Sequence, residues 1–203
     1  MPTIDYLSAA RDLRRGGAAP VIATNRINHP QVAKQLVQSG CANTVSLARR
    51  FLADAAFVSK SAQSAAESIN TCIACNQACL DQIFIGKVTS CLVNLRACYE
   101  TLMPVTPCAA PKQIAVVGAG LAGMAFALQA AQRDHRVRLY EAGDAIGGHF
   151  NIARQIPSKS EFSETLRYFS HQLDADAVEA RTRCRVTSEM PDDVDEVILA
   201  TGI

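Results

Sequence analysis

The sequence predicts an α/β protein in two parts, joined by a cysteine-rich segment. Three observations carry this prediction. Helices and strands alternate over the first 65 residues, four cysteines fall within twenty residues near the middle of the chain, and a Gly-x-Gly-x-x-Gly motif follows a strand after it. We expect the first part to be the C-terminal part of a (β/α)8 TIM barrel and the last part to be the beginning of a Rossmann-like domain.

Length and composition set the first limits on function. The 203 residues carry a formal net charge of +1 at pH 7, which gives no strong field toward nucleic acid or an anionic membrane. Residues 1–15 include several charges and no apolar stretch of the kind that directs export. Residues 114–131 are apolar enough for a membrane span, but three early glycines and a β-branched start favour a buried strand that turns into a helix. We therefore expect a cytoplasmic protein with no nucleic acid and no membrane as partner.

Residues 1–65 alternate between helical and strand patterns. Helices are expected at 4–15, 30–39 and 51–62, and short buried strands at 20–24 and 44–48. Two successive strands separated by a helix indicate a parallel sheet, and we interpret them as the last two strands of the barrel.

Arginines stand where both strands end, Arg26 after the first and Arg49 after the second. In (β/α)8 barrels the loops after the seventh and eighth strands often bind a phosphate. Arg26 and Arg49, helped by backbone N–H groups near Ala48, are therefore candidates to hold the phosphate of flavin mononucleotide (FMN). Arginines after strands are also common as solvated surface charges, and the sequence leaves that alternative open.

Four cysteines form the most unusual pattern of the chain, because Cys72, Cys75, Cys79 and Cys91 have the spacing Cys-x2-Cys-x3-Cys-x11-Cys. Four thiolates this close repel one another unless a cation binds them. Disulfides would need an oxidising compartment, and structural zinc usually takes two Cys-x2-Cys pairs. A close triplet with one remote thiolate is the general arrangement of cysteine-ligated clusters. A 4Fe-4S cluster is the leading interpretation, with zinc and disulfides as alternatives.

Three prolines, Pro104, Pro107 and Pro111, indicate a linker, because proline interrupts both helices and strand ladders. The expected segments are the barrel end at 1–65, the cluster segment at 66–103, the linker at 104–112 and the dinucleotide-binding part at 113–203.

The glycine motif consists of Gly118, Gly120 and Gly123, between a strand and a helix. Gly118 permits the tight turn, Gly120 allows the backbone to approach a pyrophosphate, and Gly123 allows the helix to pack closely on the strand. A second strand ends in Glu141, 23 residues after Gly118, where a carboxylate accepts hydrogen bonds from ribose hydroxyls and repels a 2′-phosphate. Together these residues predict a dinucleotide site.

Further elements are expected beyond Glu141. The pair Gly147-Gly148 would let the chain cross close to a bound dinucleotide, with an ordinary turn as the alternative. Residues 161–173 have the pattern of an amphipathic helix, and residues 196–202 that of a last buried strand.

Residues 72–81 and 86–94, together with the glycine motif, resemble the bacterial NADPH-dependent 2,4-dienoyl-CoA reductases, which are relatives of trimethylamine dehydrogenase and of the old yellow enzymes. The resemblance runs from Pro20 to Ile203. It implies a long chain with an FMN-binding barrel, a 4Fe-4S segment, and FAD- and NADPH-binding domains, in proteins that are monomers or oligomers. NADPH would reduce FAD, the cluster would pass electrons singly to FMN, and reduced FMN would reduce a dienoyl-CoA substrate in unsaturated fatty acid β-oxidation.

The resemblance also implies which residues contact cofactors. It assigns FMN contacts to Arg26, Ala48 and Arg49, and the ligands of the cluster to the four cysteines. It assigns FAD contacts to Gly118, Gly120, Gly123, Glu141, Gly148, His149, Phe150 and Val186.

The sequence departs from this family at several positions. Leu121 and Leu95 stand where proline is common, Ala74 where glycine is usual between the first two ligands, and His149 where glutamine is common. The first six barrel strands, the catalytic tyrosine and histidine, and most of the NADPH domain have no counterpart in the chain. We therefore expect an internal fragment that is inactive by itself and contains no catalytic residue. A related oxidoreductase, such as an amine dehydrogenase or enoate reductase, and a non-catalytic electron-transfer remnant are the alternatives.

Overall fold

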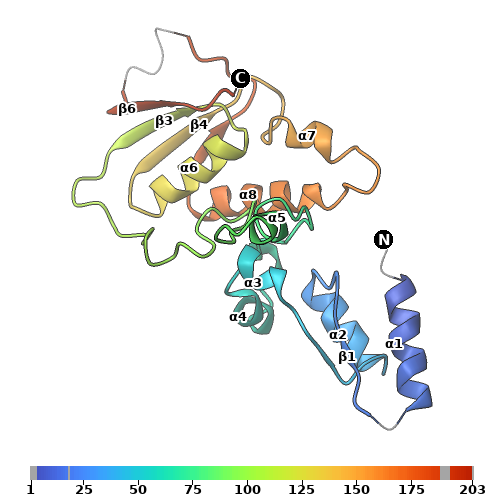
Figure 1. Cartoon of the computed structure of the whole chain (residues 1–203). Helices are drawn as coiled ribbons and strands as arrows, with labels where there is room; N and C mark the ends of the chain where they lie inside the picture. The colour runs from blue at the N-terminus through green and yellow to red at the C-terminus, as the bar shows by residue number, and fades with distance from the viewer. Residues whose placement is uncertain (1–3, 18, 188–192, 203) are drawn as a thin grey trace. The chain divides into compact units, whose positions relative to one another are not determined.

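The protein divides into two compact units, Met1–Tyr99 and Glu100–Ile203, in a computed structural model that describes residues 4–17, 19–187 and 193–202 (Figure 1). Each unit contains one parallel sheet, as the alternation of helices and strands predicts. Of the helices in these described ranges, none has both the length and the apolar character that a bilayer crossing requires.

The first unit is a parallel pair of short strands with helices before, between and after them. Its elements are α1 (Ile4–Gly16), β1 (Ile22–Ala23), α2 (Pro30–Gln38), β2 (Thr44–Val45), α3 (Arg49–Ala53), α4 (Phe57–Ala62), the 3-10 turn η1 (Ala66–Ser68) and α5 (Leu80–Phe84). Ile22 pairs with Thr44 and Ala23 with Val45. Leu36 of α2 is buried in a small core with Ile27 and Ala42. Both strands are shorter than expected, and two strands do not make a barrel, so the barrel stays a prediction.

The single helix expected at 51–62 is wrong, because the structure has two helices there. The break falls at Asp54, whose backbone is extended at φ −149° and ψ 103°. Its carboxylate accepts a hydrogen bond from the N–H of Ala56 at 3.0 Å. A short acidic side chain that bonds the backbone two residues on competes with a continuous helix.

The second unit is a four-stranded parallel sheet with the order β5-β4-β3-β6. Its elements are β3 (Gln113–Val117), α6 (Leu121–Ala131), β4 (Arg136–Tyr140), α7 (Phe150–Ala153), α8 (Phe162–Ala175), β5 (Glu179–Arg181) and β6 (Glu196–Leu199). α6 and α8 pack against each other on the same face of the sheet (Figure 1). Side chains of β3, β4, α6 and α8, such as Val116, Leu139, Met124 and Leu173, form the core between the layers.

Two elements of this unit, α7 and β5, have no predictive signal in the sequence. All three residues of β5 are exposed, so no alternation of apolar and polar side chains marks it as a strand. It forms because Arg138, Leu139 and Tyr140 of β4 offer it a pairing edge. This strand therefore forms through backbone pairing with β4 and not through burial of its side chains.

Candidate cofactor sites

The second unit has a cavity of about 690 Å³ at the carboxyl ends of β3, β4 and β6. Seven of the eight residues predicted to contact FAD line this cavity: Gly118, Gly120, Glu141, Gly148, His149, Phe150 and Val186. Ligands of open α/β sheets bind in this location, outside the carboxyl ends of the strands. The glycine motif and the residues far along the chain are therefore brought together at one site.

Each of the three motif glycines is required for a different physical reason. Gly118 has φ +105°, and a Cβ there would lie 2.4 Å from the carbonyl oxygen of Ala200. A Cβ at Gly123 would lie 1.9 Å from the carbonyl oxygen of Gly118, so this glycine allows helix α6 to pack against the preceding turn. Gly123 is not in the lining of the cavity, so its contact with FAD stays a prediction. A Cβ at Gly120 would meet no protein atom within 4 Å, which leaves open space for a ligand beside the backbone.

The N-terminus of α6 lies at this cavity, because Gly120, Leu121 and Ala122 are in its lining. Gly120 is the N-cap residue and provides no side chain to satisfy the first backbone N–H groups of the helix. Unsatisfied N–H groups at the start of a helix, together with the helix dipole, favour a bound phosphate. The geometry is suited to the pyrophosphate of a dinucleotide.

Glu141 is held in place by the backbone around it. One carboxylate oxygen accepts a hydrogen bond from the N–H of Ala119 at 2.9 Å, and the other accepts one from the N–H of Gly143 at 2.8 Å. Each carboxylate oxygen can accept more than one hydrogen bond, so acceptor capacity is left for ribose hydroxyls. Ala119 belongs to the glycine motif, and Glu141 thus joins the two halves of the predicted site.

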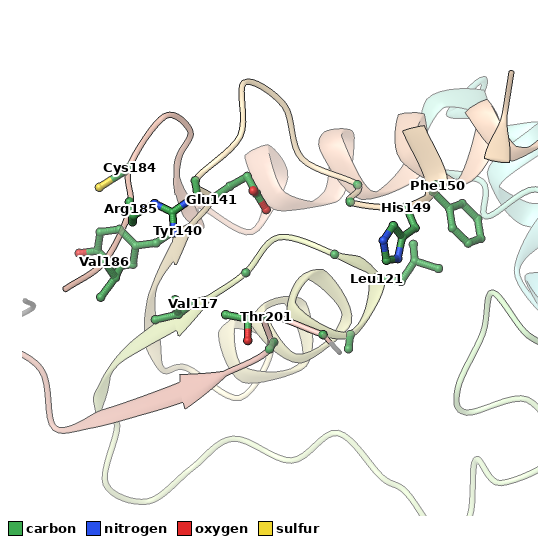
Figure 2. A pocket seen from close by; sticks show the side chains of 18 of the residues that line it. Val117, Leu121, Tyr140, Glu141, His149, Phe150, Cys184, Arg185, Val186 and Thr201 are labelled. Carbon is green, nitrogen blue, oxygen red and sulfur yellow. The ribbon is translucent and has the colours of Figure 1, made fainter. Parts of the chain in front are cut away.

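Gly147 and Gly148 belong to the site as well as to a turn. The N–H of Gly147 donates to the carbonyl of Ala119 at 2.7 Å, and Gly148 has φ +49° and passes close to Gly120. His149 and Phe150 follow directly, and Figure 2 shows His149 beside Leu121 at one end of the cavity. The pair therefore carries the chain across the glycine motif.

The opposite end of the cavity is formed by residues that sequence reasoning largely missed. Figure 2 shows Cys184, Arg185 and Val186 next to Tyr140 and Glu141. Only Val186 was predicted, through the resemblance. The segment 183–184 is fixed by the backbone, since the N–H of Cys184 donates to the carbonyl of Glu141 at 2.9 Å. No local pattern marks such a contact.

The first unit brings the four predicted cluster cysteines to one small cavity. Its lining consists of Cys72, Cys75, Cys79 and Cys91 with Arg49, Leu52, Ile73, Asn76, Ala78, Leu92 and Val93. The other four cysteines of the chain are not in this lining, and all eight are free thiols. The remote Cys91 is returned to the triplet because the N–H of Ser90 donates to the carbonyl of Ala78 at 2.7 Å.

Left-handed backbone shapes the turn that carries the cysteine triplet. Ala74 has φ +53° and Asn76 has φ +64°, on either side of Cys75. Asparagine tolerates this conformation, whereas alanine adopts it at a cost of about 1–2 kcal/mol. The glycine that the related family uses at position 74 thus has a conformational reason.

Two thiols of this cavity, those of Cys75 and Cys91, lie in surroundings that disfavour the thiolate form. Burial, with a smaller contribution from the nearby Cys72 and Cys75, raises the pKa of Cys91 to about 11. Burial also raises the pKa of Cys75, to which Cys79 and Cys72 add repulsion. Metal binding at such a site must displace the thiol protons.

The donor chemistry of the cavity fits an iron-sulfur cluster. Its lining combines four soft sulfur donors with apolar side chains and one cation, and thiolates favour such clusters. In the described part of the chain, no group of three or more His, Cys, Asp or Glu side chains is arranged to hold a metal ion. A single tetrahedral zinc ion would require all four sulfurs to lie about 2.3 Å from the metal. The structure thus shows a shared cavity, and the cluster stays a prediction.

Helix α3 attaches the cysteine segment to the strand pair, a role that the sequence did not reveal. Arg50 is buried, and its guanidinium donates to the carbonyl of Ile27 at 2.7 Å and to that of Cys72 at 2.8 Å. Asp54, at the end of the helix, accepts from the N–H of Asn70 at 2.9 Å and pairs with Lys60 at 2.7 Å. These contacts fix the chain on the N-terminal side of the first predicted ligand.

The predicted phosphate site is a cavity at the carboxyl ends of β1 and β2. Arg26, Ala48 and Arg49 all line it, and Arg50 lies beside them. Asn25 and Arg26 have left-handed backbone, with φ of +75° and +48°. Such conformations often occur at functional sites, because they turn backbone N–H groups and side chains out of the strand direction. The two arginines Arg26 and Arg49 in the lining of one cavity suit an anionic ligand.

Comparison with known proteins finds that the chain is similar to segments of larger oxidoreductases. Residues 116–183 match the NAD(P)-binding Rossmann-like domain. The chain is 35% identical over 208 residues to a metal reductase of Desulforamulus reducens, with 100% of the chain and 31% of the relative covered. It is 30% identical over 207 residues to N,N-dimethylglycine/sarcosine dehydrogenase of Chromohalobacter salexigens, with 99% of the chain and 30% of the relative covered.

A solved structure of 2-naphthoyl-CoA reductase in complex with 2-naphthoyl-CoA is similar in fold. The TM-score is 0.92 at 33% sequence identity, over 98% of this chain and 31% of that chain. The chain thus spans about a third of the length of the relatives it matches. Its second unit contains an NAD(P)-binding Rossmann-like domain, and its homologues are oxidoreductases of the trimethylamine dehydrogenase and old yellow enzyme-like group.

Proposed function

We propose that the chain is part of a flavin and iron-sulfur oxidoreductase that reduces 2,4-dienoyl-CoA with NADPH in unsaturated fatty acid β-oxidation. The observation that carries the proposal is the presence of three cofactor-type sites in one chain: the arginine-lined cavity, the four-cysteine cavity and the dinucleotide cavity. When bound, FMN, a 4Fe-4S cluster and FAD would supply hydride and single-electron transfer between NADPH and substrate.

The chain's own residues would bind and orient these groups. The N-terminus of α6 would hold the FAD pyrophosphate, and Glu141 would accept the ribose hydroxyls, which suits FAD better than a 2′-phosphorylated nucleotide. Arg26 and Arg49 would pair with the FMN phosphate. Cys72, Cys75, Cys79 and Cys91 would ligate the cluster.

The segment limits follow the same proposal. Residues 1–65 would complete an FMN-binding barrel, 66–103 would carry the cluster, 104–112 would act as linker and 113–203 would begin the FAD domain. The substrate class is supported by the similarity to a reductase that is bound to a CoA thioester. A cytoplasmic location agrees with this chemistry and is part of the proposal.

The test is a cofactor measurement on the purified chain and an activity measurement on the complete enzyme of which it is part, both after anaerobic reconstitution. Iron, sulfide, FAD and FMN are quantified, and NADPH oxidation is followed with 2,4-dienoyl-CoA, with the saturated acyl-CoA as control. We expect four iron atoms and one of each flavin per chain, and NADPH oxidation that depends on the diene. Absence of iron and flavin after reconstitution, or equal rates with the saturated control, would contradict the proposal.

Amine oxidation is a second candidate function. It is favoured by the 30% identity to N,N-dimethylglycine/sarcosine dehydrogenase along 99% of the chain. The two functions would use the same cofactor sites and differ in the direction of electron flow. Reduction of an artificial electron acceptor that depends on a secondary or tertiary amine, with no activity toward 2,4-dienoyl-CoA, would identify this second function.

A further inference from the structure

Arg49 lines two cavities of the first unit, the phosphate cavity and the cysteine cavity. It is in the wall of the phosphate cavity with Arg26 and Ala48, and in the wall of the cysteine cavity with the four predicted ligands. It is the first residue of α3, four positions after Val45, the last residue of β2. A single guanidinium side chain is thus shared by two candidate sites.

Arg49 forms a hydrogen bond with the turn that carries the cysteine triplet. A guanidinium N–H of Arg49 donates to the side-chain oxygen of Asn76. Asn76 lies between Cys75 and Cys79, and its left-handed backbone shapes the turn. It lines the cysteine cavity and is not among the residues that line the phosphate cavity.

The remaining donors of Arg49 are available to the phosphate cavity. A guanidinium carries five N–H groups in a rigid plane, so a bond from one of them fixes the direction of the others. When Asn76 holds the plane, less side-chain entropy is lost on binding a phosphate. In return, a bound phosphate restrains Arg49 and therefore the turn that bears Cys75 and Cys79.

We propose that the Arg49–Asn76 contact couples FMN phosphate binding to retention of the cluster, with Arg49 as the positioning residue for both sites. The inference deepens the proposed function and rests on it. Because coupling between two binding sites is reciprocal, loss of the cluster must weaken FMN binding by the same factor by which loss of FMN weakens cluster binding.

The test uses the purified protein with four substitutions and two ligands. Asn76→Gly removes the amide and keeps the left-handed backbone accessible. Arg49→Gln removes the cation, Arg49→Lys keeps the charge without the planar fork, and Arg26→Gln is the matched control in the phosphate cavity alone. Dissociation constants are measured for FMN and for riboflavin, which lacks the phosphate, and bound iron is measured after gel filtration.

Asn76→Gly is the decisive variant, because its side chain reaches the phosphate cavity only through Arg49. We expect it to weaken FMN binding about three- to tenfold and to leave riboflavin binding unchanged. Arg49→Gln should weaken FMN binding and also lower iron content, whereas Arg26→Gln should weaken FMN binding and retain iron. Arg49→Lys should lose the coupling. Because it keeps the positive charge, it should change the reduction potential of the cluster less than Arg49→Gln does.

A measurement without substitutions guards against misfolded variants. Iron is removed by chelation under anaerobic conditions, and FMN binding is compared before and after; FMN affinity should fall and riboflavin affinity should not. Unchanged FMN affinity in Asn76→Gly and in the iron-depleted protein would overturn the coupling and leave the proposed function intact. A protein that binds neither FMN nor iron would overturn both.

Discussion

Ala74 adopts a backbone conformation that alanine disfavours. Its φ of +53° lies in the left-handed region, between two of the predicted cluster ligands. The neighbouring Asn76 meets a similar requirement with a residue that tolerates it. The cysteine turn is thus specified by conformation as well as by its sulfur donors.

The first prediction concerns this strain. Replacing Ala74 with glycine relieves about 1–2 kcal/mol of strain and costs about 0.4–1 kcal/mol in unfolded-state entropy. We expect Ala74→Gly to raise the free energy of unfolding of the first unit by up to about 1 kcal/mol, measured by denaturant titration. Ala78→Gly is the control, because Ala78 is not in the left-handed region and should lose about 0.5–1 kcal/mol. Equal effects of the two substitutions would contradict the strain argument.

Gly123 and Gly120 separate packing from binding within one motif. A Cβ at Gly123 would lie 1.9 Å from a backbone oxygen that cannot move away, whereas a Cβ at Gly120 would meet no protein atom within 4 Å.

The second prediction follows from this pair. Gly123→Ala should destabilise the second unit by about 3 kcal/mol or more, since overpacking against backbone forces the helix to shift. Gly120→Ala should leave the thermal transition nearly unchanged and weaken FAD binding, because its methyl group would occupy the ligand's space. Thermal unfolding and FAD fluorescence titration measure the two effects. A stable Gly123→Ala protein would show that α6 can move off the strand.

At the scale of elements, the short helix α3 is the connection between the strand pair and the cysteine segment. The guanidinium of Arg50 donates to two backbone carbonyls, and the carboxylate of Asp54 accepts a hydrogen bond from the N–H of Asn70. The side-chain amide of Asn94 donates to the carbonyl of Leu52 at 2.8 Å. Arg50 and Leu52 of the helix, with Asp54 at its C-terminal end, therefore hold the cysteine segment at residues 70–72 and at residue 94.

The third prediction tests this connection through Arg50. Arg50→Met keeps most of the stem volume but leaves the carbonyls of Ile27 and Cys72 without their donor, at a cost of about 3 kcal/mol. Hydrogen exchange should accelerate in peptides that cover residues 70–94. The exposed Arg154 is the control, and Arg154→Met should change stability by no more than about 0.5 kcal/mol. Unchanged exchange over 70–94 in Arg50→Met would show that the other contacts suffice.

At the scale of the whole molecule, the candidate sites divide between the two units. The cysteine and phosphate cavities are lined only by residues 24–93, and the dinucleotide cavity only by residues 117–202. The core of the second unit is likewise formed from its own strands and helices.

The fourth prediction follows from this division. In the complete enzyme, chelation of iron should release the cluster and abolish electron delivery to the substrate, while FAD affinity changes less than about twofold, because the lining of the dinucleotide cavity includes no residue of the cysteine segment. The measurements are iron content, NADPH-dependent diene reduction and FAD titration on the same sample. Loss of FAD together with iron would show that the two sites depend on each other.

Local patterns were sufficient for much of this molecule. The strand at 113–117, the helix that follows it and the acidic strand end at Glu141 are found where the pattern predicts them, because glycine motifs and buried strands depend on neighbours in sequence. The cysteine spacing similarly identified the four residues that line one cavity.

Other features depend on contacts between residues far apart in sequence. Strand β5 exists only through pairing with β4, and the helix expected at 51–62 is broken where Asp54 binds Asn70 and Lys60. Arg49 and Arg50 have the same local sequence signal, and only the fold shows that one lines two cavities while the other is a buried structural residue.

The sequence by itself thus determined the parallel α/β pattern, the dinucleotide motif and the identity of the four grouped cysteines, since each is set by spacing along the chain. The tertiary structure alone decided the break between α3 and α4, the edge strand and the link from Arg49 to Asn76. Those features arise from hydrogen bonds and strand pairing between residues 16 to 41 positions apart, and no local periodicity in the sequence predicts such contacts.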